Sequence, residues 1–237
     1  MLQLARDDKK LYNGSMKIVP AILSNNPIEF AEQYNKLAPY FDHFSIDVLD
    51  GKFADNNTIQ PKDIMLLIKT GILKNVETKT FDFDLMVMDF NTAISDVKNL
   101  ANHMPIKRIF IHTKALKTAN INIDNISSIG LAIDKPDQVE NLYKHNNLNK
   151  IPYIQIMTIE AGFQGKPFEL ELMNKITQLR EYGYRSEIFI DGGVNNHTID
   201  KIISHPNPPD FACCGSFLTK AEHVEERIEY LKKMKLY

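Results

Sequence analysis

Short apolar runs alternate along the chain with longer segments in which leucine, isoleucine or valine recurs at helical spacing. This alternation is typical of βαβ units and of a parallel sheet. The pattern predicts eight strands, at Lys17–Leu23, His43–Val48, Glu77–Val87, Lys107–His112, Ser127–Ile133, Ile151–Met157, Ser186–Asp191 and Asp210–Cys214. The clearest helical segments are Pro27–Ala38, Pro61–Thr70, Phe168–Tyr182, Asn195–Ser204 and Glu222–Lys235.

Several helix ends carry recognisable signals. Asn26 precedes Pro27, which predicts an N-cap followed by proline at the first helical position. Asn195 is expected to cap the helix after the seventh strand, and Gly183 stands where a C-terminal glycine is expected.

No composition break or Gly/Ser linker divides the chain, so residues 16–237 are expected to form one domain. Residues 1–15 form a charged, weakly patterned extension, for which a packed arm and plain disorder are about equally good hypotheses. The oligomeric state stays open, with a homo-oligomer among the options.

The alternation alone fits both a closed barrel and an open doubly wound sheet. A glycine-rich dinucleotide loop would favour the open sheet, but the first strand is followed by Ser24-Asn25-Asn26-Pro27, without glycine. Eight units, with polar residues at the strand ends, favour a (β/α)8 TIM barrel, in which functional residues gather at the C-terminal ends of the strands.

The composition limits the kinds of ligand and partner that the chain is expected to bind. The chain is 43% hydrophobic and 24% charged, and its formal net charge of −2 gives no reason to expect nucleic acid as a ligand. No apolar run is long enough to span a bilayer, and the N-terminal residues are charged, so no membrane association and a cytoplasmic location are expected. The neighbouring Cys213 and Cys214 fit reduced packing residues better than a disulfide.

Polar side chains collect near the predicted strand ends: Asp47, Asp50, Asp84, His112 and Asp191. Acidic groups in apolar strands are expensive to bury alone, which implies a metal or a hydrogen-bond network. For Asp50, which precedes a glycine, a simple turn is the favoured interpretation.

Glycines follow the last three predicted strands, and backbone N–H groups free of side chains can converge there on an anion. These sets predict a small phosphorylated molecule as the ligand. The candidate phosphate-binding residues are Gly162, Gly165, Gly192, Gly193, Gly215 and Ser216.

Five segments together resemble the ribulose-phosphate 3-epimerase family. They are MKIVPAILS at 16–24, IDVLDGKF at 46–53, DLMV at 84–87, MTIEAGFQGKPF at 157–168 and IDGGVN at 190–195. The resemblance implies a phosphosugar-binding barrel of carbohydrate metabolism that epimerises C3 of a ketose phosphate, such as D-ribulose 5-phosphate to D-xylulose 5-phosphate in the pentose phosphate reactions. By motif position, Asp47 and Asp191 are the acid/base pair.

The resemblance also implies a pocket and a divalent metal. Ser45, Leu49, Met86, His112 and Met157 match positions around the site. The family holds its metal with those two aspartates and two histidines, but the histidine positions are Ser45 and Asp84 here. A strand-one serine of the family is also replaced, by Ala21.

Three hypotheses follow from these departures. Asp47, Asp84 and Asp191 could hold a divalent cation, Mn²⁺, Mg²⁺, Fe²⁺ or Zn²⁺, with the preference moved from Zn²⁺ towards Mn²⁺ or Mg²⁺, because carboxylate oxygen suits hard ions. Without a metal, at least one carboxylate should keep its proton and no strong electrophile would remain, so activity would be very low. A related phosphosugar lyase ranks lower, because the lysine expected two residues after the strand-two aspartate is Leu49.

A hypothesis of another class is a catalytically weak or inactive phosphosugar-binding barrel. It needs the phosphate loops and no proton chemistry. The presence of both Asp47 and Asp191 argues against it.

Overall fold

A computed structural model describes residues 16–122 and 129–237, and in it eight parallel strands close into a barrel in chain order. The strands are β1 (Lys17–Ile22), β2 (His43–Leu49), β3 (Thr80–Met86), β4 (Ile106–His112), β5 (Gly130–Ile133), β6 (Tyr153–Met157), β7 (Glu187–Asp191) and β8 (Phe211–Cys214). The predicted (β/α)8 barrel is therefore confirmed. The N-terminal extension and the start of the fifth predicted strand lie outside the described residues.

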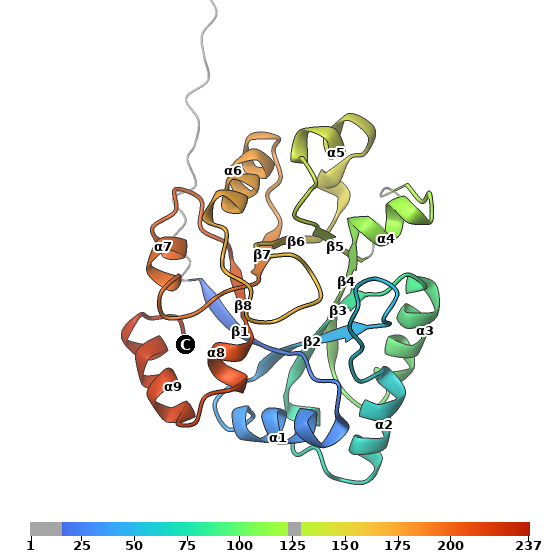
Figure 1. The fold of residues 1–237 in the computed structure, drawn as a ribbon, viewed down its shortest axis with the longest axis vertical. Coiled ribbons are helices and arrows are strands. Elements are labelled where there is room, and N and C mark those ends of the chain that lie inside the picture. Colours follow the sequence, from blue (N-terminus) through green and yellow to red (C-terminus); the bar gives the residue numbers. More distant parts are fainter. Residues whose placement is uncertain (1–15, 123–128) are drawn as a thin grey trace, which may run out of the picture.

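Helices surround the barrel (Figure 1). They are α1 (Pro27–Leu37), α2 (Pro61–Lys69), α3 (Phe90–Leu100), α4 (Thr113–Thr118), α5 (Val139–His145), α6 (Asn174–Glu181), α7 (Ile199–Ile203), α8 (Ser216–Thr219) and α9 (Val224–Lys233), with short 3-10 turns η1 (Val76–Thr78), η3 (Leu148–Lys150) and η4 (Leu170–Met173). Because helices cover the outside and side chains fill the inside, the strands are buried on both faces. None of the described helices is long and apolar enough to cross a membrane.

Two of the expected helix ends are confirmed. The Asn26 side chain accepts hydrogen bonds from the backbone N–H groups of Ile28 and Glu29, and Pro27 opens α1. Gly183 follows the cap of α6 with a φ of 87°, a left-handed conformation that glycine adopts without strain.

Three predicted elements differ from the structure. The long third strand is divided into η1 and β3. The helix expected from Phe168 begins only as η4, and Glu169, just before it, donates its N–H to the carbonyl of Thr158. The cap of α7 is Thr198, not Asn195. The Asn195 side chain accepts the N–H of His197 and closes a turn before the helix starts.

The barrel interior is packed in layers. Near the N-terminal ends of the strands, buried Arg108 pairs with Asp82 and Glu187, and its guanidinium lies 4.8 Å from the Phe189 ring centroid. Aromatic side chains fill the middle, and Asp47 and Asp191 lie towards the opposite end. The barrel is therefore a filled core with one polar mouth.

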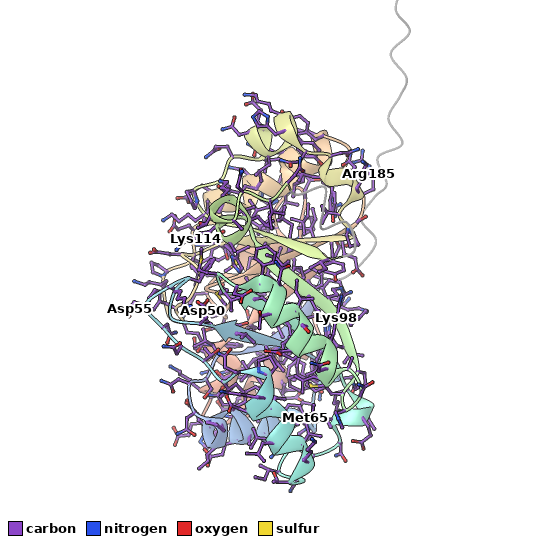
Figure 2. All side chains as sticks on the ribbon, turned by 90° about the vertical axis from the view of Figure 1, so that its right-hand side faces the viewer. Asp50, Asp55, Met65, Lys98, Lys114 and Arg185 are labelled. Carbon is purple, nitrogen blue, oxygen red and sulfur yellow. The ribbon has the colours of Figure 1, made fainter. Side chains whose placement is uncertain are left out.

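The loops after the strands share one side of the molecule. Figure 2 shows Asp50, after β2, and Lys114, after β4, on one side, and Arg185, just before β7, on the other. The loop after β6 passes in front of the strands in Figure 1. This side carries every candidate phosphate-binding residue, because each follows the C-terminal end of a strand.

Candidate active site

A cavity of about 110 Å³ opens among the loops at the C-terminal ends of the strands. Asp47 of β2 and Asp191 of β7 both line it. Met86 and Met157, the last residues of β3 and β6, supply apolar wall. The glycines and the serine expected to bind phosphate all line the same cavity.

The two aspartates form an electrostatically coupled acid pair. Burial, followed by the charges of Asp191 and Asp84, raises the pKa of Asp47 well above its usual range. Burial and the charge of Asp84 raise the pKa of Asp191 to about 7, against the lowering effects of His112 and the Gly192 N–H. Because both pKa values are raised, each carboxyl group holds a proton more readily near neutral pH than a free aspartate does.

Close packing shapes the loop after β7. Gly193 has a φ of 67°, and a Cβ built there would lie 2.9 Å from backbone atoms of Phe168. The Thr158 hydroxyl donates to the carbonyls of Asp191 and Gly192, which ties the β6 and β7 loops together. Glycine at position 193 therefore allows both loops to reach the cavity.

The cavity-lining side chains that the sequence reasoning missed include Gln164 and Lys166. The Gln164 Nε2 is buried without a hydrogen-bond partner, and it would lie 2.8 Å from a Cβ built on Gly215. A buried amide donor without a partner inside a cavity is suited to bind a ligand oxygen. The sequence could have pointed to both side chains, because they lie in the segment at 157–168 that also contains the candidate phosphate-binding residues Gly162 and Gly165.

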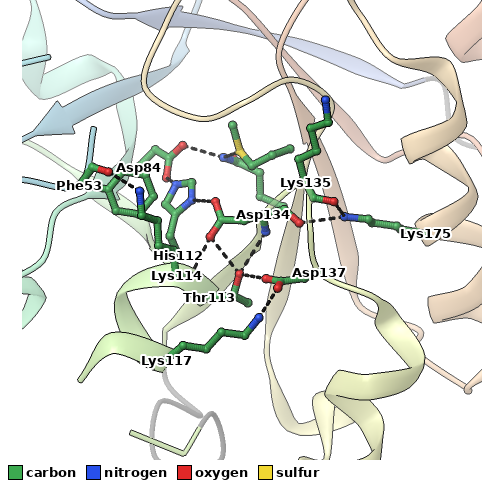
Figure 3. A network of polar contacts seen from close by, with 12 residues as sticks. Phe53, Asp84, His112, Thr113, Lys114, Lys117, Asp134, Lys135, Asp137 and Lys175 are labelled. Carbon is green, nitrogen blue, oxygen red and sulfur yellow. Dashed lines mark hydrogen bonds and ion pairs between the residues drawn. The ribbon is translucent and has the colours of Figure 1, made fainter. Parts of the chain in front are cut away.

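Asp84 and His112 lie in a polar network behind the cavity wall (Figure 3). The Asp84 Oδ2 accepts a hydrogen bond from Gln155 Nε2 at 2.7 Å. Its Oδ1 lies 2.9 Å from His112 Nε2, and His112 Nδ1 lies 2.6 Å from Asp134 Oδ1. Asp84 is thus one layer deeper than Met86, because successive inward-facing residues of β3 are two positions apart.

These residues do not fit the expected metal site. In the described parts of the chain, no three His, Cys, Asp or Glu side chains are placed to hold a metal ion. The oxygens of Asp84 contact His112 and Gln155, so this carboxylate belongs to the network behind the cavity wall. The three-carboxylate arrangement expected from the sequence is not formed.

Three residues expected in the pocket lie elsewhere. Ser45 is buried two positions before Asp47, one layer deeper. Leu49 packs in an apolar cluster with Phe53, and His112 is fully buried, so none of the three lines the cavity.

Asp50 forms a turn, as favoured from the sequence. Its carboxylate accepts the backbone N–H groups of Lys52, Phe53 and Met88. It does not line the cavity.

Comparison with protein families gives a match over residues 17–211 to the model described as "Ribulose-phosphate 3 epimerase family". The ribulose-phosphate 3-epimerase of Methanocaldococcus jannaschii is 29% identical over 77% of this chain and 76% of that protein. The cytoplasmic isoform of Oryza sativa is 25% identical over 93% of this chain and 94% of that protein, and the Escherichia coli K12 enzyme is 26% identical over 78% and 81%.

Solved structures share the barrel at low sequence identity. The phospho-2-dehydro-3-deoxyheptonate aldolase of Thermotoga maritima has a TM-score of 0.57 at 11% identity, covering 94% of this chain and 70% of that one. The thiamine phosphate pyrophosphorylase of Pyrococcus furiosus has a TM-score of 0.51 at 15% identity, covering 92% and 94%. At these identities the likeness establishes the fold alone.

Proposed function

Because the chain belongs to the ribulose-phosphate 3-epimerase family, we propose that it epimerises C3 of a phosphorylated ketose such as D-ribulose 5-phosphate, with Asp47 and Asp191 as the acid/base pair. The observation that carries this proposal is the shared cavity position of two carboxyl groups, buried Asp47 and half-buried Asp191, whose pKa values are both raised by burial and by neighbouring negative charge.

The proton transfer needs one aspartate as a carboxylate and the other as a carboxylic acid. One aspartate, as the carboxylate, removes the C3 proton, and the electrons of the C–H bond pass to the C2 carbonyl oxygen to give an ene-diolate. The other aspartate, as the acid, returns a proton to the opposite face of C3. The pair ends with the proton on the first aspartate, and the direction of the reaction decides which one begins.

The phosphate would bind at the glycine loops. Gly193 and Gly215 bring backbone close to the cavity, and Ser216 starts α8, where the first N–H groups have no intrahelical partner. Gln164 Nε2 adds a buried donor beside Gly215, and Lys166 adds positive charge at the cavity edge. Several donors around one anion anchor the substrate and present its C3 to the aspartates.

The test is exchange of the C3 proton of ribulose 5-phosphate with solvent, followed by NMR in D₂O. The wild-type protein should incorporate deuterium and form xylulose 5-phosphate. Asp47→Asn and Asp191→Asn should each reduce exchange by about 10³-fold or more, because each removes one face of the pair. Asp50→Asn is the matched control. Asp50 directly follows β2, the strand that carries Asp47, but it does not line the cavity.

In the described residues no group of side chains is placed to hold a metal ion, and this observation favours a second candidate function, a barrel that binds a phosphosugar without converting it. It would bind ribulose 5-phosphate, detected by calorimetry, and catalyse no exchange. Exchange that persists in both asparagine variants would also reject the aspartate mechanism.

A further inference from the structure

The cavity has a polar end and an apolar end. Apart from the acid pair and one thiol, the hydrogen-bonding side chains of the described lining all follow β6, β7 or β8, and they are Gln164, Lys166, Asn195 and Ser216. The lining side chains on or directly after β1 and β3 are instead apolar, and they are Ala21, Leu23 and Met86. The two ends of the cavity therefore suit different parts of a ligand.

The strand order sets the direction in which a ketose phosphate would lie. β3 and β7 are on opposite sides of the eight-stranded ring (Figure 1). A phosphate bound by the glycine loops after β7 and β8, with C3 between Asp47 and Asp191, leaves C2 and C1 on the side of β1 and β3. The C1 end of the substrate would therefore meet Leu23 and Met86.

Three polar side chains on or next to the strands of this region are turned to other partners or are weak donors. The Ser24 hydroxyl donates to a carboxylate oxygen of Glu29 at 2.9 Å. Ser45 is buried and does not line the cavity. The thiol of Cys213, a weak donor, lies 4.0 Å from Gln155 Oε1. None of these three side chains is placed to replace the water around a hydroxyl at C1.

The apolar end is also sheltered from solvent. Met86 is 1% exposed and packs with Leu49 and Phe53, and Leu23 packs against the same cluster. A hydroxyl group placed there would lose its hydrogen bonds to water without gaining a strong partner, whereas a methyl group has no such bonds to lose. An apolar pocket rejects an added hydroxyl only by a limited factor, so the hydroxylated compound would still bind, but less tightly.

We propose that the preferred substrate of this chain is a 1-deoxyketose phosphate, in which C1 is a methyl group, and that Leu23 and Met86 set this preference. The preference rests on the proposed epimerase function and names the substrate class of the same site. The reaction is balanced without a co-reactant. One aspartate takes the C3 proton, the electron pair of the C–H bond moves to the C2 oxygen, and the other aspartate returns a proton to the opposite face of C3. C1 takes no part in this transfer, so replacing its hydroxyl by hydrogen leaves the bonds that form and break unchanged.

The first experiment compares ribulose 5-phosphate with its 1-deoxy analogue on the purified full-length protein. Exchange of the C3 proton, followed by NMR in D₂O, should give a kcat/KM that is about 10- to 100-fold higher for the 1-deoxy compound. Calorimetry should show that the 1-deoxy compound binds at least about tenfold more tightly. Equal values, or a preference for ribulose 5-phosphate in either measurement, overturn the proposal.

The second experiment adds a donor at the apolar end. Met86→Gln keeps the length of the side chain and adds an amide, so it should lower the preference for the 1-deoxy compound by about tenfold. Met86→Leu is the matched control, because it adds no donor and should keep the preference. Gln164→Ala removes a donor at the polar end and should weaken the binding of both compounds by the same factor. A preference that Met86→Gln leaves unchanged, in a protein that still binds both compounds, overturns the role of Met86.

Binding and turnover test the two proposals separately. If neither compound exchanges its C3 proton but the 1-deoxy compound binds more tightly, the epimerase function is rejected and the preference of the site for a methyl group at C1 stands. If both compounds exchange and ribulose 5-phosphate is preferred, the epimerase function stands and the preference is rejected. If neither compound binds, both proposals are rejected. The calorimetric comparison uses the wild-type protein, so it does not depend on the folding of a variant.

Discussion

Replacing Asp191 by asparagine should stabilise the folded protein at alkaline pH and have little effect below about pH 4. The pKa of Asp191 is raised from 3.8 to about 7, first by burial and then by the charge of Asp84. The folded protein therefore binds this proton more tightly than the unfolded chain does. The stabilisation that this bound proton provides is complete below the pKa of Asp191 in the unfolded chain, and it is lost as the pH rises through about 7, the pKa in the folded protein.

The magnitude follows from the shift. A difference of about three pKa units corresponds to about 4 kcal/mol at 1.36 kcal/mol per unit. Asp191 lines an open cavity and is partly exposed, so solvent screening reduces the expected gain to about 2 kcal/mol. Asparagine is close in shape and cannot ionise, so it should recover most of this energy at pH 8 while the proton exchange is lost.

The assay is urea denaturation of wild type and Asp191→Asn at pH 4, 6 and 8, read by circular dichroism. The difference in the free energy of unfolding should grow with pH. Asp50→Asn gives the opposite sign, because backbone N–H donors from Met88, Phe53 and Lys52 outweigh burial and lower the pKa of Asp50. A difference for Asp191→Asn that is constant with pH, or that falls as the pH rises, would refute the reasoning.

Three further predictions concern the cavity and the residues behind its wall. Gln164→Ala should raise KM for ribulose 5-phosphate by about tenfold with little change in kcat, since it removes one donor to the ligand; unchanged KM and inorganic phosphate affinity would contradict this role. Gly193→Ala should destabilise the fold by about 1–3 kcal/mol, measured by urea titration, because of its φ of 67° and the Phe168 backbone 2.9 Å from the new Cβ. Ser45→His combined with Asp84→His should raise Zn²⁺ affinity in calorimetry, while either change alone should not, because imidazole nitrogen is a preferred zinc ligand and one replacement leaves the set incomplete.

The local pattern of the chain was sufficient for the fold and for part of the site. Helical and strand periods are properties of neighbouring residues, so eight units and the cap at Asn26 could be predicted. Parallel strands of a barrel end on the same side, which is why Asp47 and Asp191 could be expected to share a cavity although 144 positions separate them (191 − 47).

Hydrogen-bond partners were decided only by the closed barrel. Asp84, His112 and Gln155 come from β3, β4 and β6, and Asp134 directly follows β5. No spacing in the sequence says that Asp84 will meet His112 instead of Asp47 and Asp191. A carboxylate has two oxygens, and the inward-facing side chains that reach them depend on the layer and stagger of the strands around the barrel. The sequence alone therefore determined that charged groups would collect at the mouth, and the tertiary structure decided which of them face the cavity and which neutralise one another behind it.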